Sequence, residues 1–91
     1  MLKIKPGSRF KKDLKKFRHN KSTLSELDKV LKILVRKEEL TAKYQDHTLS
    51  GTWNSSRECH VKPDVLLVYR IDKKSQLLIL ERLGSHSELF K

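Results

Sequence analysis

The chain begins with two short patterns of apolar and polar residues that are separated by a turn. Residues 2–5 alternate apolar and polar side chains, which predicts a short strand that ends at the Pro-Gly pair. Ser8 is expected to cap the helix that follows. One face of this helix carries apolar residues at i, i+4 and i+7, namely Phe10, Leu14 and Phe17. The pattern predicts a strand followed by an amphipathic helix.

A second helical pattern starts after a turn at residues 19–21. Thr23 with Glu26 three residues later forms a capping-box pattern, so we expect the helix to begin there and to end near residues 36–37. Its apolar positions are Leu24, Leu27, Val30, Leu31 and Leu34. Because the connection is only about four residues long, the two helices are expected to pair antiparallel.

The second half of the chain shows strand patterns instead. Residues 38–48 are interpreted as a loop, and residues 49–53 as the start of an extended region, with Trp53 at a sheet edge. Residues 57–61 alternate in polarity and predict a strand. Residues 65–71 are almost continuously apolar, which favours a central strand, and a hairpin joins them to a partner strand at 77–83.

These elements predict an α+β fold with the order β-α-α-β-β-β and a short C-terminal helix. Gly84 ends the last strand, and Ser85 is expected to cap a final turn that runs to Phe90. Because the helices come early and the strands late, the two N-terminal helices should pack on one face of a small antiparallel sheet. The other face should stay partly open. Residues 1–91 are interpreted as a single domain.

Charge narrows the class of partner. The chain carries 21 Lys and Arg against 11 Asp and Glu, a formal net charge of +10, which indicates a negatively charged partner such as nucleic acid, an acidic protein or an anionic membrane surface. The first predicted helix carries basic residues off its apolar face, which either contact RNA or form a solvated surface: Lys11, Lys12, Lys15, Lys16 and Arg18. A single cysteine and no long apolar run predict a cytosolic protein without a membrane span.

Ionisable side chains gather in the C-terminal half. Strand alternation places Arg82 on the same side as Leu78 and Leu80. In an antiparallel hairpin the start of strand 65–71 lies beside the end of strand 77–83. His60 and Asp64 should therefore approach Arg82, and His86 follows Gly84 by two positions. We expect these four groups to converge at one end of the sheet.

Such a set of side chains suits cleavage of RNA. A base takes the proton of the 2′-hydroxyl, a cation stabilises the charged transition state, and an acid protonates the leaving 5′-oxygen, so that no metal is required. DNA lacks the 2′-hydroxyl. A zinc site of His47, His60 and His86 is disfavoured because their spacing matches no compact ligand motif. His19 lies in a basic turn and is interpreted as idle, as most single surface histidines are.

Several stretches in the C-terminal half resemble the YafQ branch of the RelE/ParE toxin superfamily. They are YQDHTLSGTW at 44–53, RECHVKPD at 57–64, LVYR at 67–70 and ERLGSHSELF at 81–90. The resemblance implies a type II toxin that cuts mRNA on the translating ribosome without a metal or other cofactor. It also implies a cognate antitoxin that covers the site and often represses the operon through operator DNA.

The resemblance implies catalytic roles for His47, His60, Asp64 and His86, a phosphate-stabilising role for Arg82, and a supporting role for Phe90. Our assignment makes His86 the general acid and Asp64 or His60 the general base. Position 65 is valine, where some relatives carry an aromatic that could stack on a base, so sequence preference at the cut is left open.

Other functions remain as alternatives. A ParE-like toxin acting on gyrase has a similar fold and no nuclease activity, but it would not need three histidines around Asp64 and Arg82. A basic RNA-binding module without chemistry could lose every histidine and still bind. An antitoxin or repressor is disfavoured because no helix-turn-helix pattern is present.

Overall fold

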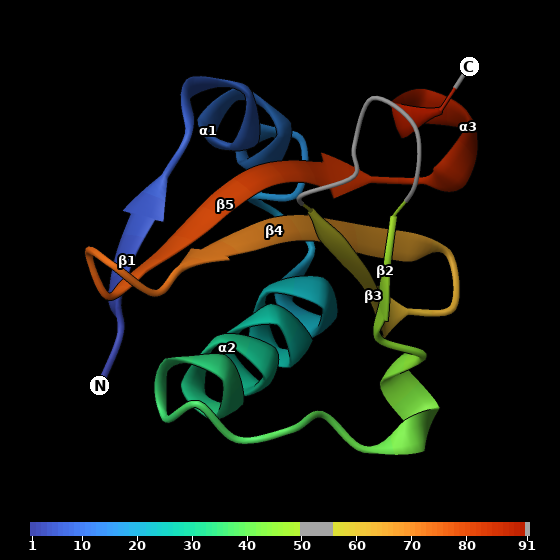
Figure 1. Cartoon of the computed structure of the whole chain (residues 1–91). Coiled ribbons are helices and arrows are strands. Elements are labelled where there is room, and N and C mark those ends of the chain that lie inside the picture. Colours follow the sequence, from blue (N-terminus) through green and yellow to red (C-terminus); the bar gives the residue numbers. More distant parts are fainter. Residues whose placement is uncertain (50–55, 91) are drawn as a thin grey trace.

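The computed structural model describes residues 1–49 and 56–90, and within them five strands form one sheet of order β1-β5-β4-β3-β2 (Figure 1). The α+β class is confirmed, and the predicted elements occur in the predicted order, with a 3-10 turn and a two-residue strand added in the segment predicted as a loop. The elements are β1 (Lys3–Pro6), α1 (Ser8–Lys15), α2 (Lys21–Val35), the 3-10 turn η1 (Ala42–Tyr44), β2 (His47–Thr48), β3 (Arg57–Lys62), β4 (Val65–Asp72), β5 (Leu77–Gly84) and α3 (His86–Leu89).

The strand order follows from the apolar pattern. β4 lies at the centre of the sheet, as expected for the most continuously apolar segment, and pairs antiparallel with both β3 and β5. β1 pairs with β5 in parallel, from Lys3 opposite Leu77 to Pro6 opposite Leu80, so the sheet is mixed rather than purely antiparallel. Parallel pairing requires a long crossover, which the two helices and the other strands provide.

Both N-terminal helices start earlier than their predicted caps. Gly7, not Ser8, precedes α1, and it makes no side-chain cap. α2 is capped by Asn20, whose side chain accepts a hydrogen bond from the Thr23 amide at 3.1 Å. The Thr23 capping-box prediction was therefore wrong. Asparagine is as strong an N-cap as threonine, and it stands three residues before that amide, the position from which a cap side chain can reach it.

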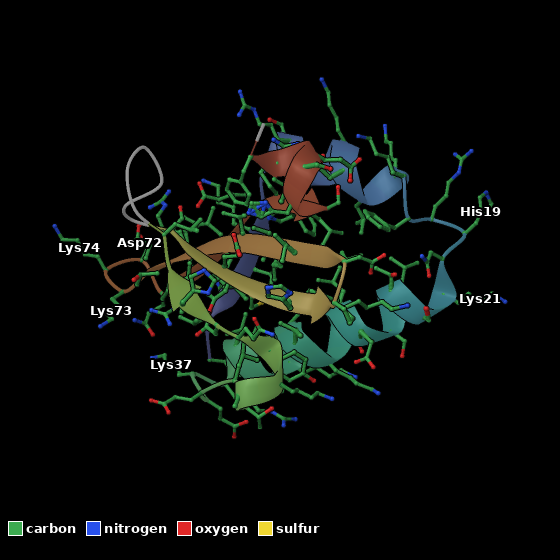
Figure 2. The ribbon with its side chains drawn as sticks, turned by 90° about the vertical axis from the view of Figure 1, so that its right-hand side faces the viewer. His19, Lys21, Lys37, Asp72, Lys73 and Lys74 are labelled. Carbon is green, nitrogen blue, oxygen red and sulfur yellow. The ribbon has the colours of Figure 1, made fainter. Side chains whose placement is uncertain are left out.

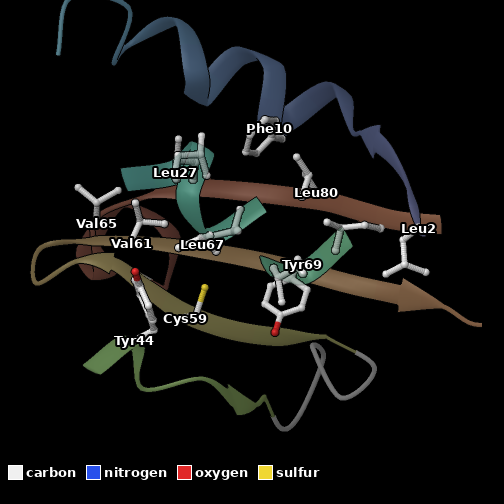
Figure 3. Close-up of a cluster of buried hydrophobic side chains, with 14 residues drawn as sticks. Leu2, Phe10, Leu27, Tyr44, Cys59, Val61, Val65, Leu67, Tyr69 and Leu80 are labelled. Atoms are coloured by element: carbon white, nitrogen blue, oxygen red, sulfur yellow. The ribbon is translucent and has the colours of Figure 1, made fainter. Parts of the chain in front are cut away.

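The main core lies between α2 and the sheet, on the side we call the α2 face (Figures 1 and 3). Val30 of α2 packs into one cluster with Leu67 and Tyr69 of β4, and Phe10 of α1 joins the same cluster. The two helices therefore serve a common core. Cys59 is also buried here, and burial raises the pKa of its thiol to about 12, as expected for an unreactive cysteine.

A smaller cluster lies on the opposite side, which we call the α3 face. Leu66 and Val68 of β4 pack against Leu89 of α3, with Leu49 and Phe90 at the margin. Figure 1 shows α3 and α2 on opposite sides of the sheet. Alternation along β4 explains the division, because neighbouring residues of a strand point to opposite faces. This face, which was expected to stay partly open, is partly covered by α3.

The segment predicted as a loop at 38–48 contains η1 and the two-residue strand β2. β2 pairs with β3, His47 opposite Glu58, and pairing across strands is what holds so short a segment extended. Of the extended region expected at 49–53, only Leu49 falls among the described residues, and Trp53 lies outside them. Among the described residues, no helix is long and apolar enough to cross a membrane.

Candidate functional site

A register shift in the β4–β5 hairpin decides where Arg82 lies. Val68 pairs with Arg82 and Tyr69 pairs with Leu80, so Glu81 is an extra residue in β5. An extra residue of this kind interrupts simple alternation. Leu80 consequently belongs to the α2-face core, whereas Arg82 shares the side of Val68, the α3 face. The prediction that Arg82 lies on the same side as Leu78 and Leu80 was therefore wrong.

The shift brings the predicted site residues into two rows across the α3 face. In the first row, the paired positions run from His47 through Glu58 and Val68 to Arg82. Residues paired directly across strands share a face, so all four side chains belong to this side of the sheet. Neighbouring strands lie about 5 Å apart, which puts the backbones of Glu58 and Arg82 about 10 Å apart.

The second row is two residues further along the strands. His60 of β3 pairs with Leu66 of β4, and Leu66 pairs with Gly84 of β5. Alternation keeps His60 on the face of Glu58, and His86 follows Gly84 at the start of α3. The strand pairing predicted from the sequence is confirmed here: the start of β4 lies beside the end of β5.

A cleft of about 370 Å³ opens beside this second row. Its lining brings His60 and Asp64 together with His86, three of the four groups expected to converge. Arg82 lies outside this cleft, at the α1 side of the face. The other lining residues are Glu58, Pro63, Leu66, Ser85 and Ser87. The cleft thus holds ionisable groups from β3, the β3–β4 turn and α3.

α3 is held in place by a complete capping box, as predicted for Ser85. The Ser85 hydroxyl accepts from the Glu88 amide, and the Glu88 carboxylate accepts from the Ser85 amide at 2.9 Å. The hydrogen bond from that amide lowers the pKa of Glu88. His86 is the first residue of α3, and its ring lies 5.1 Å from that of Phe90. Capping and ring contact together orient His86.

Glu58 was missed in the sequence, although the structure places it beside two predicted residues. Its side chain is only 8% exposed, and its carboxylate lies 3.6 Å from Nε2 of His47. The other ring nitrogen of His47, Nδ1, lies 2.7 Å from the Gln45 carbonyl. The signal was available, since Glu58 stands two residues before His60 in a predicted strand and must share its face. A buried carboxylate therefore belongs to the site.

Arg82 is paired with an acid from the first helix. Its Nε and Nη2 donate to Asp13 at 2.8 and 3.2 Å, and the Leu83 amide donates to the same carboxylate at 2.9 Å. Burial opposes ionisation of Asp13, but these hydrogen bonds outweigh it and lower the pKa of the carboxyl. The hydrogen bond from Arg82 to Asp13 raises the pKa of Arg82, so the arginine stays charged.

A second charged network anchors the base of β2. Asp46 accepts from Nη2 of Arg57 at 2.9 Å and from the Tyr69 hydroxyl at 2.6 Å. The hydrogen bond to Asp46 raises the pKa of Arg57. The pKa of Tyr69 is raised mainly by burial and then by the hydrogen bond from its own hydroxyl to Asp46. Asp46 precedes His47, so the network holds the strand that carries this histidine.

The basic residues of α1 and the turn after it are exposed, as expected: Lys11, Lys12, Lys15, Lys16 and Arg18. Lys16 lies 3.8 Å from Glu88 of α3. His19 projects from the turn between α1 and α2 (Figure 2) and does not line the cleft. Figure 2 also shows Lys73 and Lys74 at the β4–β5 turn, on the opposite side of the molecule. Positive charge is therefore spread beyond the first helix.

Comparison with known proteins identifies the family. A family model described as a bacterial toxin of type II toxin–antitoxin system, YafQ, matches residues 2–91. The chain is 34% identical over 88 residues to the mRNA interferase toxin YafQ of Escherichia coli strain K12, a match that covers 96% of this chain and 94% of that protein.

Solved structures agree with the family match. The crystal structure of a metal-bound toxin from Helicobacter pylori has a TM-score of 0.91 at 50% identity, covering 99% of this chain and 100% of that one. YafQ in the Escherichia coli DinJ-YafQ complex has a TM-score of 0.86 at 32% identity, covering 100% of both chains.

The side chains of the described residues can be checked for a set that could bind a metal ion. Within positions 1–49 and 56–90, no group of three or more His, Cys, Asp or Glu is arranged to hold a metal ion. The described residues do not form the ligand set of a protein metal site, which commonly takes three or four side chains. That the reaction proceeds without a metal or cofactor stays a prediction.

Proposed function

Because this chain belongs to the YafQ family of type II toxin–antitoxin toxins, we propose that it is an endoribonuclease that cleaves mRNA on the translating ribosome. The observation that carries the proposal is the clustering of His60, Asp64 and His86 around one cleft, with Arg82 and His47 on the same sheet face. Proton donors, proton acceptors and a fixed cation are the parts that RNA cleavage needs.

The reaction uses the attacking group that RNA itself carries. Asp64 or His60 takes the proton of the 2′-hydroxyl, and the 2′-oxygen forms a bond to the neighbouring phosphorus. The bond from phosphorus to the 5′-oxygen breaks as His86 gives that oxygen a proton. The products are a 2′,3′-cyclic phosphate and a 5′-hydroxyl end. Arg82 stabilises the negative charge that builds up on the phosphate oxygens.

His47 and Phe90 support these groups from either side. Nδ1 of His47 lies 2.7 Å from the Gln45 carbonyl, within hydrogen-bond distance, and Nε2 faces the Glu58 carboxylate at 3.6 Å. A histidine held this way keeps a fixed direction toward substrate. Phe90 packs on the ring of His86 and limits the positions that the proposed acid can take.

Partners follow from charge and family. The exposed lysines of α1 contact ribosomal RNA through its phosphates, a contact that does not depend on sequence. A cognate antitoxin neutralises the toxin, as the Escherichia coli relative forms a complex with DinJ. Such an antitoxin covers the site and brings the pair to operator DNA. The protein acts in the cytoplasm, where ribosomes are.

The proposal is tested by primer extension on ribosome-bound mRNA with wild type and His86→Ala. Wild type should produce new 5′ ends, and the variant should produce them at least about 100-fold more slowly, the usual range for loss of a general acid. His19→Ala is the matched control, because His19 is exposed and lies outside the cleft. It should cleave like wild type.

Antitoxin binding and growth separate the outcomes further. His86→Ala should bind the antitoxin as tightly as wild type and should no longer arrest growth. Growth arrest by His86→Ala would contradict its assignment as the acid. Growth arrest by wild type without any cleavage of mRNA would favour a toxin that acts on another target, such as gyrase.

A further inference from the structure

Asp13 is a buried acid in the most basic segment of the chain. It is 5% exposed, although its neighbours Lys11, Lys12 and Lys15 are all exposed. A buried carboxylate costs free energy unless it is paired and hydrogen-bonded. Asp13 meets this condition. β1 pairs with β5 only as far as Leu80, and beyond that point the Asp13 carboxylate accepts a hydrogen bond from the Leu83 amide of β5. This contact joins α1 to the sheet.

The geometry of the Asp13–Arg82 pair leaves part of the guanidinium free of Asp13. Oδ2 of Asp13 accepts from Nε, and Oδ1 accepts from Nη2. A guanidinium has five N–H donors, so Nη1 keeps both of its donors for another acceptor. Because the fork is planar and rigid, two bonds on one edge fix the direction in which the remaining donors point.

The same region is linked to α3. Lys16 follows the last residue of α1, three positions after Asp13, and lies 3.8 Å from the Glu88 carboxylate. Glu88 in turn closes the capping box that begins α3 at His86. Arg82, Asp13, Lys16 and Glu88, in that order, therefore alternate in charge from β5 across α1 to α3. The basic helix is connected to the elements that carry both Arg82 and His86.

We propose that Asp13 is a positioning residue for RNA cleavage: it holds Arg82 so that the free donors of the guanidinium meet the scissile phosphate. The inference rests on the proposed function and adds a residue to it. Asp13 does not touch the substrate. It acts through Arg82, and its loss lets the guanidinium turn away from the position that the phosphate takes.

The test is a pair of substitutions read separately for ribosome binding and for cleavage. Asp13→Asn removes the charge and replaces one acceptor by a donor. The single-turnover cleavage rate at saturating ribosome complex should fall about 10- to 100-fold, as when a supporting contact misplaces a catalytic group. The dissociation constant for the ribosome should change less than about 2-fold, since α1 keeps all of its lysines. Asp28→Asn is the control, an exposed helix acid 2.9 Å from Lys32.

A double-substitution cycle shows whether Asp13 acts through Arg82. In an Arg82→Ala background, Asp13→Asn should cause no further loss of rate, because the group that it positions is gone. Independent losses that multiply would overturn the inference. If wild type cleaves and Asp13→Asn cleaves at the same rate, the inference is also overturned. If wild type does not cleave, the proposed function is rejected instead.

A measurement on wild type covers the case in which Asp13→Asn does not fold. The Nε–H group of Arg82 can be followed by ¹⁵N relaxation in the intact protein. Held by Asp13, it should be as rigid as the backbone, with an order parameter of about 0.85. A freely rotating Arg82 side chain would overturn the inference without any substitution.

Discussion

At the scale of single residues, two acids that no motif singles out organise the site. Glu58 stands against His47, and Asp13 stands against Arg82. Both are buried, and both place an acidic side chain where the sequence pattern leads one to expect solvent or core. Glu58 could have been found from its strand spacing to His60. Asp13 directly precedes Leu14, a residue of the predicted apolar face, and only the contact of Asp13 with β5 reveals that it pairs with the sheet.

The lowered pKa of Asp13 makes stability depend on pH in a defined direction. A carboxyl whose folded pKa is below its ordinary value of 3.8 stabilises the fold above that value, and the contribution is lost as pH falls through the lower folded pKa. Asp13→Asn should therefore lower the free energy of unfolding at pH 7 by about 1–3 kcal/mol, the cost of disrupting buried hydrogen bonds to a charged group.

Urea unfolding between pH 7 and pH 3 checks this expectation. The difference between wild type and Asp13→Asn should be constant near neutrality and should shrink below the ordinary carboxyl value of 3.8. A difference that stays the same down to pH 3 would mean that Asp13 keeps no charge-dependent interaction in the folded state.

At the scale of elements, one extra residue in β5 has the largest effect on the site. The predicted strands themselves are confirmed, and so is the hairpin that joins β4 to β5. Strict alternation placed Arg82 with Leu80, whereas the shift at Glu81 turns it to the face of His60 and Glu58. Periodicity does not reveal such a shift, because a bulge depends on how two strands twist together.

The basic surface of α1 leads to a prediction at the scale of elements. Lys12→Gln with Lys15→Gln should weaken ribosome binding and make the affinity less dependent on salt. The slope of log affinity against log salt should fall by about 1 for each phosphate that the protein no longer neutralises. Co-sedimentation with ribosomes at several salt concentrations measures both quantities.

The control for that experiment removes the same charge from the other helix. Lys29 and Lys32 lie on α2 and pair with Glu26 and Asp28. Lys29→Gln with Lys32→Gln should change the salt slope little. Equal effects of the two double substitutions would show that net charge, and not the surface of α1, governs binding.

At the scale of the whole molecule, the sheet separates stability from chemistry. The α2 face holds the larger core, and the α3 face holds the smaller cluster together with the site. Neighbouring leucines of β4 illustrate the division. Leu67 is fully buried against α2, while Leu66 lies at the cleft that His60 and His86 line.

The same substitution at these two neighbours should separate the roles. Leu67→Ala should lower the free energy of unfolding by about 2–5 kcal/mol, the range for a large core truncation, and the folded fraction should still cleave at the wild-type rate. Leu66→Ala should slow cleavage as well, because it alters the cleft. Urea unfolding and single-turnover cleavage measure the two effects, and a normal rate for Leu66→Ala would contradict this division.

Apolar periodicity and turn residues were enough to determine the helices, every strand except β2, the central place of β4 and the approach of His60 and Asp64 to His86, because these depend on spacing along the chain. The motifs were enough to indicate the family. The parallel place of β1, the face of Arg82 and its pairing with Asp13 were decided only by tertiary structure. Each of these joins residues through the register and packing of separate elements, and the energy of such contacts has no local signature.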